Sequence, residues 1–484
     1  MRRLAGIFTV VTLTFSAAIL NGPTSAASDR PTGGRTAAAN PLAETVFRNP
    51  INTSADPTMV FHDGEYFIAT TQGDRIRMWH SPSIASLINA PFVDVWQDSD
   101  PSRNQQMWAP GLYHFNGHWY LYYTASDGID ANHRNYVLES AGDDPLGPYT
   151  FKSRIADFGE YAIDGEPFTH NGQLYYAWAG PGRGQGGPAQ TWATKLDNPW
   201  TAVGVRVALP VNNGGCPEVR EGPTTLQRNG RTFLTYSTCD TGKPDYQLWM
   251  ISIADGADPL VPGNWTQYPN SVFSRNDAAG TWGPGHHFFF RSPDGTEDWI
   301  AYHGKNTTVY NYGWRTARAQ KFTWNGDGTP NFGRPVALGE SIPLPAGDPG
   351  PGSRAINDVD EGTGDFQVSY TGTWDKGAQC GSQCFNGDDH WSGTAGNTAT
   401  FHFTGTQIAL FSVRDVGNGM AAMSIDGGPE VEIDYYGDPR VGQQLNYLSP
   451  QLPAGAHTLT VRVTGKTTGG SATIVSVDRA EVWP

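Results

Sequence analysis

The stretch FHDGEYFIAT, residues 61–70, places an Asp-Gly pair between two runs of strand-forming residues. Asp-Gly and Asn-Gly pairs favour the tight turns that connect twisted antiparallel strands. Four more stretches repeat this pattern of a turn glycine followed by an aromatic strand: HFNGHWYLYYT (114–124), THNGQLYYAWA (169–179), QRNGRTFLTYS (227–237) and RSPDGTEDWIAYH (291–303). We therefore expect five matching β-hairpins.

The spacing of the hairpins predicts the architecture. The five turn glycines follow one another at intervals of 53, 55, 58 and 65 residues, which leaves room for one four-stranded sheet and its loops per repeat. A hairpin repeated at near-regular spacing is typical of a β-propeller, here with five blades over residues 45–342. The alternative is an ordinary β-sandwich with chance turns, and five matched hairpins argue against it.

The composition supports an all-β fold class and limits the partners. The chain has 59 Gly, 35 Pro and 16 Trp but only 7 Met, so it is rich in turns and aromatics and poor in helix formers. Asp and Glu outnumber Lys and Arg by 47 to 32, which argues against nucleic acid and anionic membranes as partners. The charge is compatible with a neutral substrate, and we expect a monomer.

The N-terminus has the order of a secretory signal peptide. Two arginines follow Met1, an apolar run covers residues 4–20, and the small residues of 24–26 follow it. The apolar run is too short for a stable membrane span. We expect a signal peptide at 1–27, a short extension at 28–44, and a secreted, extracellular protein.

A second module follows the predicted propeller. The stretch PLPAGDPGPGSR, residues 343–354, is rich in Pro and Gly and is typical of a linker. Residues 355–484 alternate apolar and polar side chains, as in TATFHFTG and HTLTVRVTG, which predicts a β-sandwich. It resembles modules appended to secreted carbohydrate-active enzymes, so it is a possible carbohydrate-binding module. Its candidate sugar platforms, each equally compatible with a core position, are Trp374, Trp391, Tyr435 and Tyr436.

The four cysteines fall into two local pairs. Export permits disulfide bonds, and we expect Cys216 to bond Cys239 and Cys380 to bond Cys384. Four cysteines allow three connectivities, so the sequence does not decide the pairing.

One position of the repeat carries the candidate chemistry. Eight or nine residues before the five turn glycines stand, in order, Asp56, Trp108, Asp164, Glu221 and His286. If the strand before each hairpin lines a central channel, these side chains converge on one axis. Carboxylates placed close together repel and raise one another's pKa, so a fold keeps such a cluster where chemistry needs it.

Three carboxylates suit the hydrolysis of a glycosidic bond. That reaction needs a proton donor for the leaving oxygen and a carboxylate that activates water or attacks the sugar. The donor must stay protonated near neutral pH, and a third carboxylate nearby can raise its pKa. Trp108 would supply an apolar wall for a sugar face. A propeller that binds sugar without catalysis is the alternative from another class, but a lectin needs no general acid.

The motifs around these positions resemble glycoside hydrolase family 43. The resemblance covers about residues 45–345 and is carried by Ala55-Asp56-Pro57, Trp108-Ala109-Pro110, Ile163-Asp164-Gly165, Glu221-Gly222-Pro223 and Gly283-Pro284-Gly285-His286. It implies an inverting mechanism. By position, Asp56 would be the general base, Glu221 the general acid, and Asp164 the residue that modulates the pKa of the acid.

The same resemblance implies further roles. His286 would help to hold a hydrated metal ion, a structural Ca²⁺ in the channel, through waters, and the chemistry would require no cofactor. Arg315 would contact the substrate near the base. Trp79 and Trp178 are further candidate substrate platforms, although most propeller tryptophans pack between blades.

Within the family, stretches such as DPLGPY (144–149) and GPGHH (283–287) look most like secreted exo-acting α-L-arabinofuranosidases. The expected partner is an arabinose-containing polysaccharide or oligosaccharide. The alternatives are a β-xylosidase, an endo-arabinanase or a galactofuranosidase of the same family.

Overall fold

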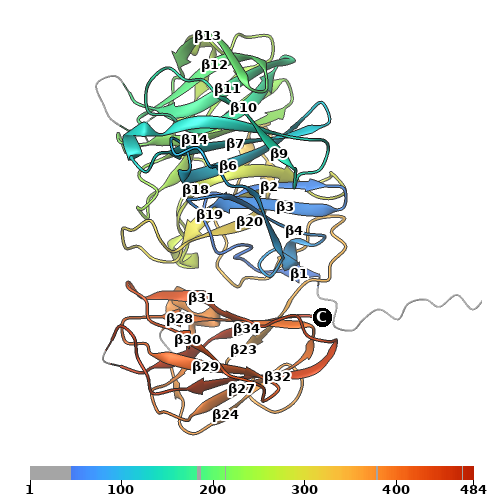
Figure 1. Ribbon diagram of the computed structural model, residues 1–484, viewed down its shortest axis with the longest axis vertical. Helices are drawn as coiled ribbons and strands as arrows, with labels where there is room; N and C mark the ends of the chain where they lie inside the picture. The colour runs from blue at the N-terminus through green and yellow to red at the C-terminus, as the bar shows by residue number, and fades with distance from the viewer. Residues whose placement is uncertain (1–44, 183–186, 213, 378–379, 471) are drawn as a thin grey trace, which may run out of the picture. The chain divides into compact units, whose positions relative to one another are not determined.

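The structure of the chain is a computed structural model that describes residues 45–182, 187–212, 214–377, 380–470 and 472–484. The predicted signal peptide (1–27) and extension (28–44) lie outside the described residues. Within those residues the secondary structure is all β, apart from six short 3₁₀ helices (Figure 1). These are η1 (Ile84–Ser86), η2 (Asp130–Asn132), η3 (Pro262–Asn264), η4 (Asp277–Ala279), η5 (Gly381–Gln383) and η6 (Phe385–Gly387). In this part of the chain, no helix has the length and apolar character needed to cross a bilayer.

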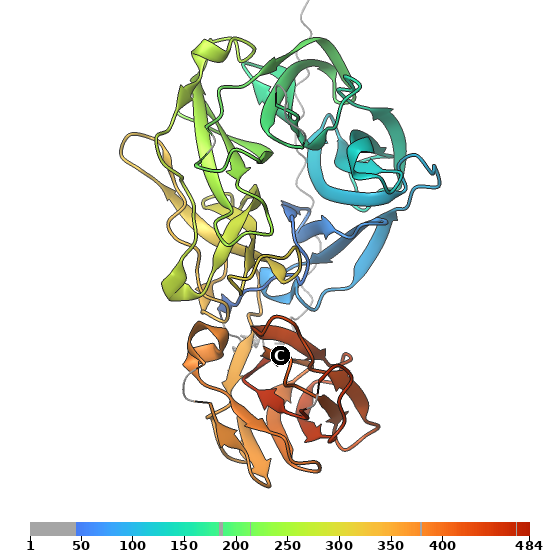
Figure 2. The same cartoon turned by 90° about the vertical axis from the view of Figure 1, so that its left-hand side faces the viewer.

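Five four-stranded antiparallel sheets follow one another along the chain, each with its strands in chain order (Figures 1 and 2). The first has β2 (Thr58–His62), β3 (Glu65–Thr71), β4 (Ile76–Ser81) and β5 (Phe92–Trp96). The second has β6 (Gln105–Phe115), β7 (His118–Ser126), β8 (Arg134–Ser140) and β9 (Tyr149–Arg154). The third has β10 (Ile163–His170), β11 (Gln173–Gly180), β12 (Gln190–Asn198) and β13 (Thr201–Ala208). The fourth has β14 (Arg220–Arg228), β15 (Arg231–Thr238), β16 (Gln247–Ala254) and β17 (Thr266–Gln267). The fifth has β18 (Trp282–Arg291), β19 (Asp298–Lys305), β20 (Arg315–Trp324) and β21 (Pro330–Asn331).

The five hairpins predicted from the sequence are confirmed. Each predicted turn joins the first two strands of one sheet. In four of them an Asp or Asn with positive φ precedes a Gly with positive φ, as in Asp63 (46°) and Gly64 (86°). Two consecutive positive φ values define the turn whose twist matches the flanking strands, and this explains the Asp-Gly and Asn-Gly pairs.

Hydrophobic clusters lie between successive sheets. One contains Ile68 of β3 and Trp299 of β19, so the first sheet packs against the fifth. Four others join the first sheet to the second, the second to the third, the third to the fourth and the fourth to the fifth. The start of the chain is also hydrogen-bonded to the fifth sheet, because Asn49 bonds both the carbonyl and the N–H of Ala319, at 3.0 and 2.9 Å.

Two short strands flank the five sheets in sequence. β1 (Val46–Phe47) pairs with β22 (Ile342–Pro343), and the next strand, β23, begins at Arg354. The stretch predicted as a linker, 343–354, therefore carries strand residues only at its two ends.

The C-terminal residues form three more sheets. One has the order β23 (Arg354–Asn357), β34 (Arg479–Trp483), β28 (Gln407–Arg414) and β31 (Val441–Leu448). Another has the order β24 (Gln367–Thr371), β27 (Thr398–Gly405), β32 (Gly455–Val463), β29 (Met420–Ile425) and β30 (Val431–Asp434). The third has the order β25 (Asp375–Lys376), β26 (His390–Ser392) and β33 (Val475–Val477).

One core joins the two larger C-terminal sheets. Leu410 of the first sheet and Phe401 of the second lie in the same buried cluster, so the sheets pack face to face. Tyr435 belongs to this core and Trp374 packs against it, so Tyr435 in particular is not the exposed sugar platform that the sequence allowed.

The two expected disulfide bonds are present. Cys216 bonds Cys239 and Cys380 bonds Cys384, which confirms the local pairing.

Candidate active site

The repeat position lies where the first strand of a sheet is irregular. The β10–β11 ladder shifts register just after Ile163, and the β14–β15 ladder shifts just after Glu221. Asp56, Asp164 and His286 have φ values of 59°, 53° and 41°. Left-handed backbone is uncommon outside glycine, and such bulges re-aim side chains and gather at functional sites.

Hydroxyl groups from the second strand of one sheet hold the bulge of the next. In three places a Thr or Ser at the end of a second strand accepts a hydrogen bond from the backbone N–H at the repeat position or one residue after it. The pairs are Ala109 with Thr71 (2.9 Å), Asp164 with Thr124 (2.9 Å) and His286 with Ser237 (3.0 Å). This repeated bond fixes each functional residue relative to the preceding sheet.

The repeat-position side chains share one cavity of ≈ 540 Å³. The sequence-predicted residues that line it are Asp56, Trp108, Asp164, Glu221, His286 and Arg315. These residues, distant in the sequence, therefore meet at one place as predicted, while their catalytic roles remain proposals.

Asp56 is held as a carboxylate. Its Oδ1 accepts hydrogen bonds from Arg315 and His303, both at 2.9 Å, and its Oδ2 accepts one from Thr71 at 2.8 Å. Burial by itself would raise the pKa of Asp56. The positive charge of Arg315 and the hydrogen bond from His303 outweigh burial and hold the pKa well below its usual value.

The donors of Asp56 form a closed hydrogen-bonded ring. Arg315 also donates to the hydroxyl of Thr241 at 3.1 Å, and that hydroxyl lies 3.2 Å from Nε2 of His303. Because the Thr241 oxygen accepts from Arg315, its own proton is free to go to Nε2. Nδ1 of His303 then carries the ring proton and donates it to Asp56. Burial lowers the pKa of His303 to about 3, so the imidazole is neutral.

Glu221 has the opposite electrostatic environment. Burial raises its pKa to about 7, and the charges of Asp56 and Asp240 act in the same direction. The hydroxyl of Tyr246 donates to Oε1 of Glu221 at 2.8 Å and acts in the lowering direction. Glu221 can therefore carry a proton near neutral pH, as a general acid must.

Asp164 lies beside the other two acids. Burial raises its pKa well above the usual value, and the charges of Glu221 and Asp56 raise it further. Its Oδ2 lies 3.7 Å from Nδ1 of His286, and the N–H of Gly222 bonds its carboxylate. The Asp164 carboxylate therefore contacts both Gly222, the residue after Glu221, and His286, which lines the cavity.

The three predicted tryptophans have different positions. Trp108 lines the cavity and packs on the His133 ring, with centroids 4.0 Å apart and planes inclined by 30°. Trp178 is 1% exposed and belongs to the core between the second and third sheets. Trp79 packs against the core between the first and fifth sheets. Neither lines the cavity, so the assignment of Trp79 and Trp178 as substrate platforms is corrected to a packing role.

Three residues that bond the cavity carboxylates are not predicted from the sequence. His303, Tyr246 and Thr71 each bond one of the carboxylates, but none stands eight or nine residues before a turn glycine. Two of these residues could have been found by counting forward from the turn glycines of the same repeat. Thr71 and Ser237 both stand seven residues after their turn glycine, and His303 stands eight after Gly295.

The resemblance implied a hydrated calcium ion near His286. Burial lowers the pKa of His286, so its neutral ring could face water ligands. Among the described residues, however, no group of three His, Cys, Asp or Glu side chains around His286 is close enough to bind one ion directly. A directly coordinated metal does not fit, and no chemical step is assigned to one.

Comparison with known proteins decides the family. The profile named Glycosyl hydrolases family 43 matches residues 47–330, more than half of the chain. The chain belongs to this family. It is thus a glycoside hydrolase, and the matched range contains all three cavity carboxylates.

The chain is also similar to proteins named as arabinofuranosidases. The chain is 35% identical over 356 residues to a protein of Streptomyces avermitilis named extracellular exo-alpha-(1->5)-L-arabinofuranosidase, covering 70% of this chain and 72% of that protein. It is 34% identical over 302 residues to alpha-L-arabinofuranosidase 43 of Humicola insolens, covering 59% of this chain and 62% of that protein.

Solved structures agree with the fold. The crystal structure of an alpha-L-arabinofuranosidase from Lactobacillus brevis matches with a TM-score of 0.57 and 31% identity, over 61% of this chain and 98% of that chain. A structure titled glycoside hydrolase matches over 90% of this chain and 99% of that chain, with a TM-score of 0.52. At 16% identity this second match speaks for the fold alone.

Proposed function

We propose that this glycoside hydrolase is a secreted, exo-acting, inverting α-L-arabinofuranosidase that removes terminal arabinofuranosyl residues from plant polysaccharides or oligosaccharides. The observation that carries the proposal is the pair Asp56 and Glu221 in one cavity, with the pKa of one lowered and that of the other raised. Two carboxyl groups whose environments separate their pKa values are the pattern of a base and an acid.

The roles follow from those environments. Glu221, protonated near neutral pH, would donate a proton to the glycosidic oxygen as the bond to the sugar breaks. Asp56, ionised and hydrogen-bonded, would take a proton from the water that attacks the anomeric carbon from the opposite side. The family resemblance adds that Asp164 would modulate the pKa of the acid and orient it, and Trp108 would support one face of the sugar.

We propose that the site lies at the centre of a closed five-bladed β-propeller formed by residues 45–342, followed by a linker at 343–354 and a β-sandwich at 355–484. Support comes from five successive four-stranded sheets, and from hydrophobic clusters that join each sheet to the next and the fifth to the first. In such an arrangement, equivalent positions of the first strands meet at one axis.

The choice of arabinofuranose and of exo action is supported by the names of the relatives, which also call two of them extracellular. Export agrees with the predicted signal peptide. The cavity wall includes Asp130 of η2, in the connection between β7 and β8 that also carries His133 behind Trp108. A wall built by such a connection favours a pocket for a terminal sugar.

A panel of nitrophenyl glycosides tests the sugar. We expect release from the α-L-arabinofuranoside to exceed release from the β-D-xyloside and the β-D-galactofuranoside. A preference for the β-D-xyloside would indicate a β-xylosidase, and a preference for the β-D-galactofuranoside would indicate a galactofuranosidase.

Product analysis tests the mode of cleavage. From linear arabinan we expect only free arabinose at early times, and NMR should show it first in the anomeric form opposite to that of the substrate. Early oligosaccharides would indicate an endo-arabinanase, and retained configuration would remove the roles given to Asp56 and Glu221.

A further inference from the structure

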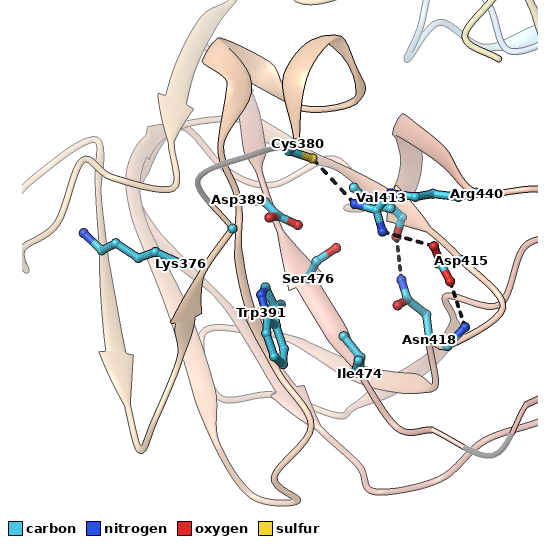
Figure 3. A pocket seen from close by; sticks show the side chains of 12 residues that line it. Lys376, Cys380, Asp389, Trp391, Val413, Asp415, Asn418, Arg440, Ile474 and Ser476 are labelled. Carbon is cyan, nitrogen blue, oxygen red and sulfur yellow. Dashed lines mark hydrogen bonds and ion pairs between the residues drawn. The ribbon is translucent and has the colours of Figure 1, made fainter. Parts of the chain in front are cut away.

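A second cavity lies in the C-terminal sheets, beside the three-stranded sheet β25–β26–β33 (Figure 3). Its volume is ≈ 530 Å³, within the range of about 300–1,000 Å³ that is common for small-ligand pockets. Trp391 of β26 and Ser476 of β33 both line it, and they stand directly opposite each other in the ladder. Opposite residues project from the same face of a sheet, so the two side chains form one continuous wall.

Asp389 places a carboxylate in this cavity. It is 5% exposed, and Figure 3 shows its carboxylate directed into the cavity. Within the part of the chain that the structure describes, no hydrogen bond reaches this carboxylate. Its Oδ1 rests against Gly377, where a Cβ would collide with it. Burial raises the pKa of Asp389 to about 6. A carboxylate that faces a cavity without a hydrogen bond from the protein can accept hydrogen bonds from a ligand with donor groups.

The charges around the cavity select against ionic ligands. Arg440 pairs with Asp415 at 3.1 Å and Lys376 pairs with Glu361 at 3.0 Å, and the charge of Arg440 also acts on Asp389. The positive charges of the lining are therefore matched by acids, and no excess of either sign favours a charged ligand. A metal ion finds too few ligands, because Cys380 and Cys384, the neighbours of Asp389, are joined in a disulfide and offer no thiolate. A neutral molecule rich in hydroxyl groups fits better.

An aromatic surface stands next to the carboxylate. Trp391 is half-buried, stands two residues after Asp389, and lies on the same side of the cavity as Asp389 in Figure 3. A tryptophan ring offers a broad apolar face with a polar edge, which suits the C–H face of a sugar ring. A carboxylate can accept from two neighbouring hydroxyl groups of that ring.

We propose that this cavity is a binding site for a neutral sugar residue of an arabinose- or xylose-containing glycan, with Trp391 as its stacking surface and Asp389 as its hydrogen-bond acceptor. The choice of these glycans rests on the proposed function, while the site rests on the cavity itself. The site would hold the enzyme on polysaccharide without taking part in bond cleavage.

Affinity electrophoresis of the full chain in gels containing soluble arabinan or arabinoxylan tests the proposal. The host is the Glu221→Gln chain, so that the polysaccharide is not digested. Asp389→Ala and Trp391→Ala should each weaken retardation by about tenfold or more, the loss expected for a hydrogen bond to a charged group or a stacking surface. Glu432→Gln, which changes an exposed acid of β30 outside the cavity, is the control and should be retarded like the host.

Three further readouts decide the result. Asp389→Asn keeps the size of the side chain, so weakened binding with an unchanged unfolding temperature separates ligand binding from folding. Asp389→Ala and Trp391→Ala in the otherwise unchanged enzyme should keep full activity on the nitrophenyl arabinofuranoside. This measurement tests the proposed catalytic function independently of glycan binding at the second cavity. Unaltered retardation in both cavity variants, or no retardation of the host by either polysaccharide, would overturn the proposal.

Discussion

Asp56 and His303 are bonded through Oδ1 and Nδ1 at 2.9 Å, although 247 residues separate them in the sequence. The same oxygen accepts from Arg315, and Oδ2 accepts from Thr71. A carboxylate offers about four acceptor sites, so these three donors leave room for a water. The arrangement keeps Asp56 ionised and fixed in direction while allowing it to accept a proton.

Replacing His303 by Ala should impair the base. The His303 bond lowers the pKa of Asp56, so its loss should raise that pKa and move the acidic limb of the kcat/KM profile to higher pH. We also expect kcat to fall about tenfold or more, since a positioned base contributes ~10²–10⁴-fold. A pH series on nitrophenyl arabinofuranoside measures both effects.

His62→Ala is the control for that experiment, because His62 lies in the first sheet away from the cavity. It should leave the profile in place. An acidic limb that does not move in the His303 variant would mean that another group sets it.

Replacing Glu221 by Gln removes the proposed proton donor. Turnover should fall by ~10²–10⁴-fold on substrates with poor leaving groups and much less on aryl glycosides with good ones. Glu218→Gln is a matched control, since Glu218 pairs with Lys243 and does not line the cavity. Comparison of kcat on both substrate types checks the assignment, and equal losses on the two would argue against an acid role.

The basic limb of the pH profile should follow Glu221. Its pKa of about 7 predicts that kcat falls as pH rises through that value, because only the protonated acid can donate. Tyr246→Phe removes the hydrogen bond that lowers this pKa, so the limb should move to higher pH. Tyr175→Phe, outside the cavity, should not move it. A downward shift in the Tyr246 variant would contradict the proposed pairing.

The parts of the site that the sequence predicts are those that a repeat makes visible. Asp56, Asp164 and Glu221 occupy one position in the first, third and fourth hairpins, and their turn glycines can be counted without a structure. The sequence cannot show that Asp164 and His286 take positive φ, or that the hydroxyls of Thr124 and Ser237 hold them. Those features depend on the contact between neighbouring sheets.

The errors have the same origin. Trp108 and Trp178 both lie within strands of the predicted hairpins, β6 and β11, and only packing separates the core residue from the one that lines the cavity. His303 lies in the hairpin with the longest turn: Arg291 pairs with Asp298 there, whereas His62 pairs with Glu65 in the first hairpin. Its distance in sequence from the turn glycine therefore differs from that of Thr71 and Ser237, which hides its position in the repeat. The buried Asp389 could not be recognised at all, since its isolation appears only once its neighbours are placed.

The disulfide between Cys216 and Cys239 should matter for activity as well as stability. It ties the segment before β14, which carries Glu221, to the end of β15, where Thr241 of the Asp56 network follows. Replacing both cysteines by Ala should lower the free energy of unfolding by about 3 kcal/mol, because the bond closes a loop across a separation of 23 residues. The Cys380–Cys384 bond spans a separation of only 4, so its removal should cost about 2 kcal/mol and leave kcat unchanged. Urea unfolding and aryl-arabinofuranoside kinetics of both double variants measure the difference. Loss of stability without loss of kcat in the Cys216/Cys239 variant would show that the network around Asp56 holds its geometry without this covalent link.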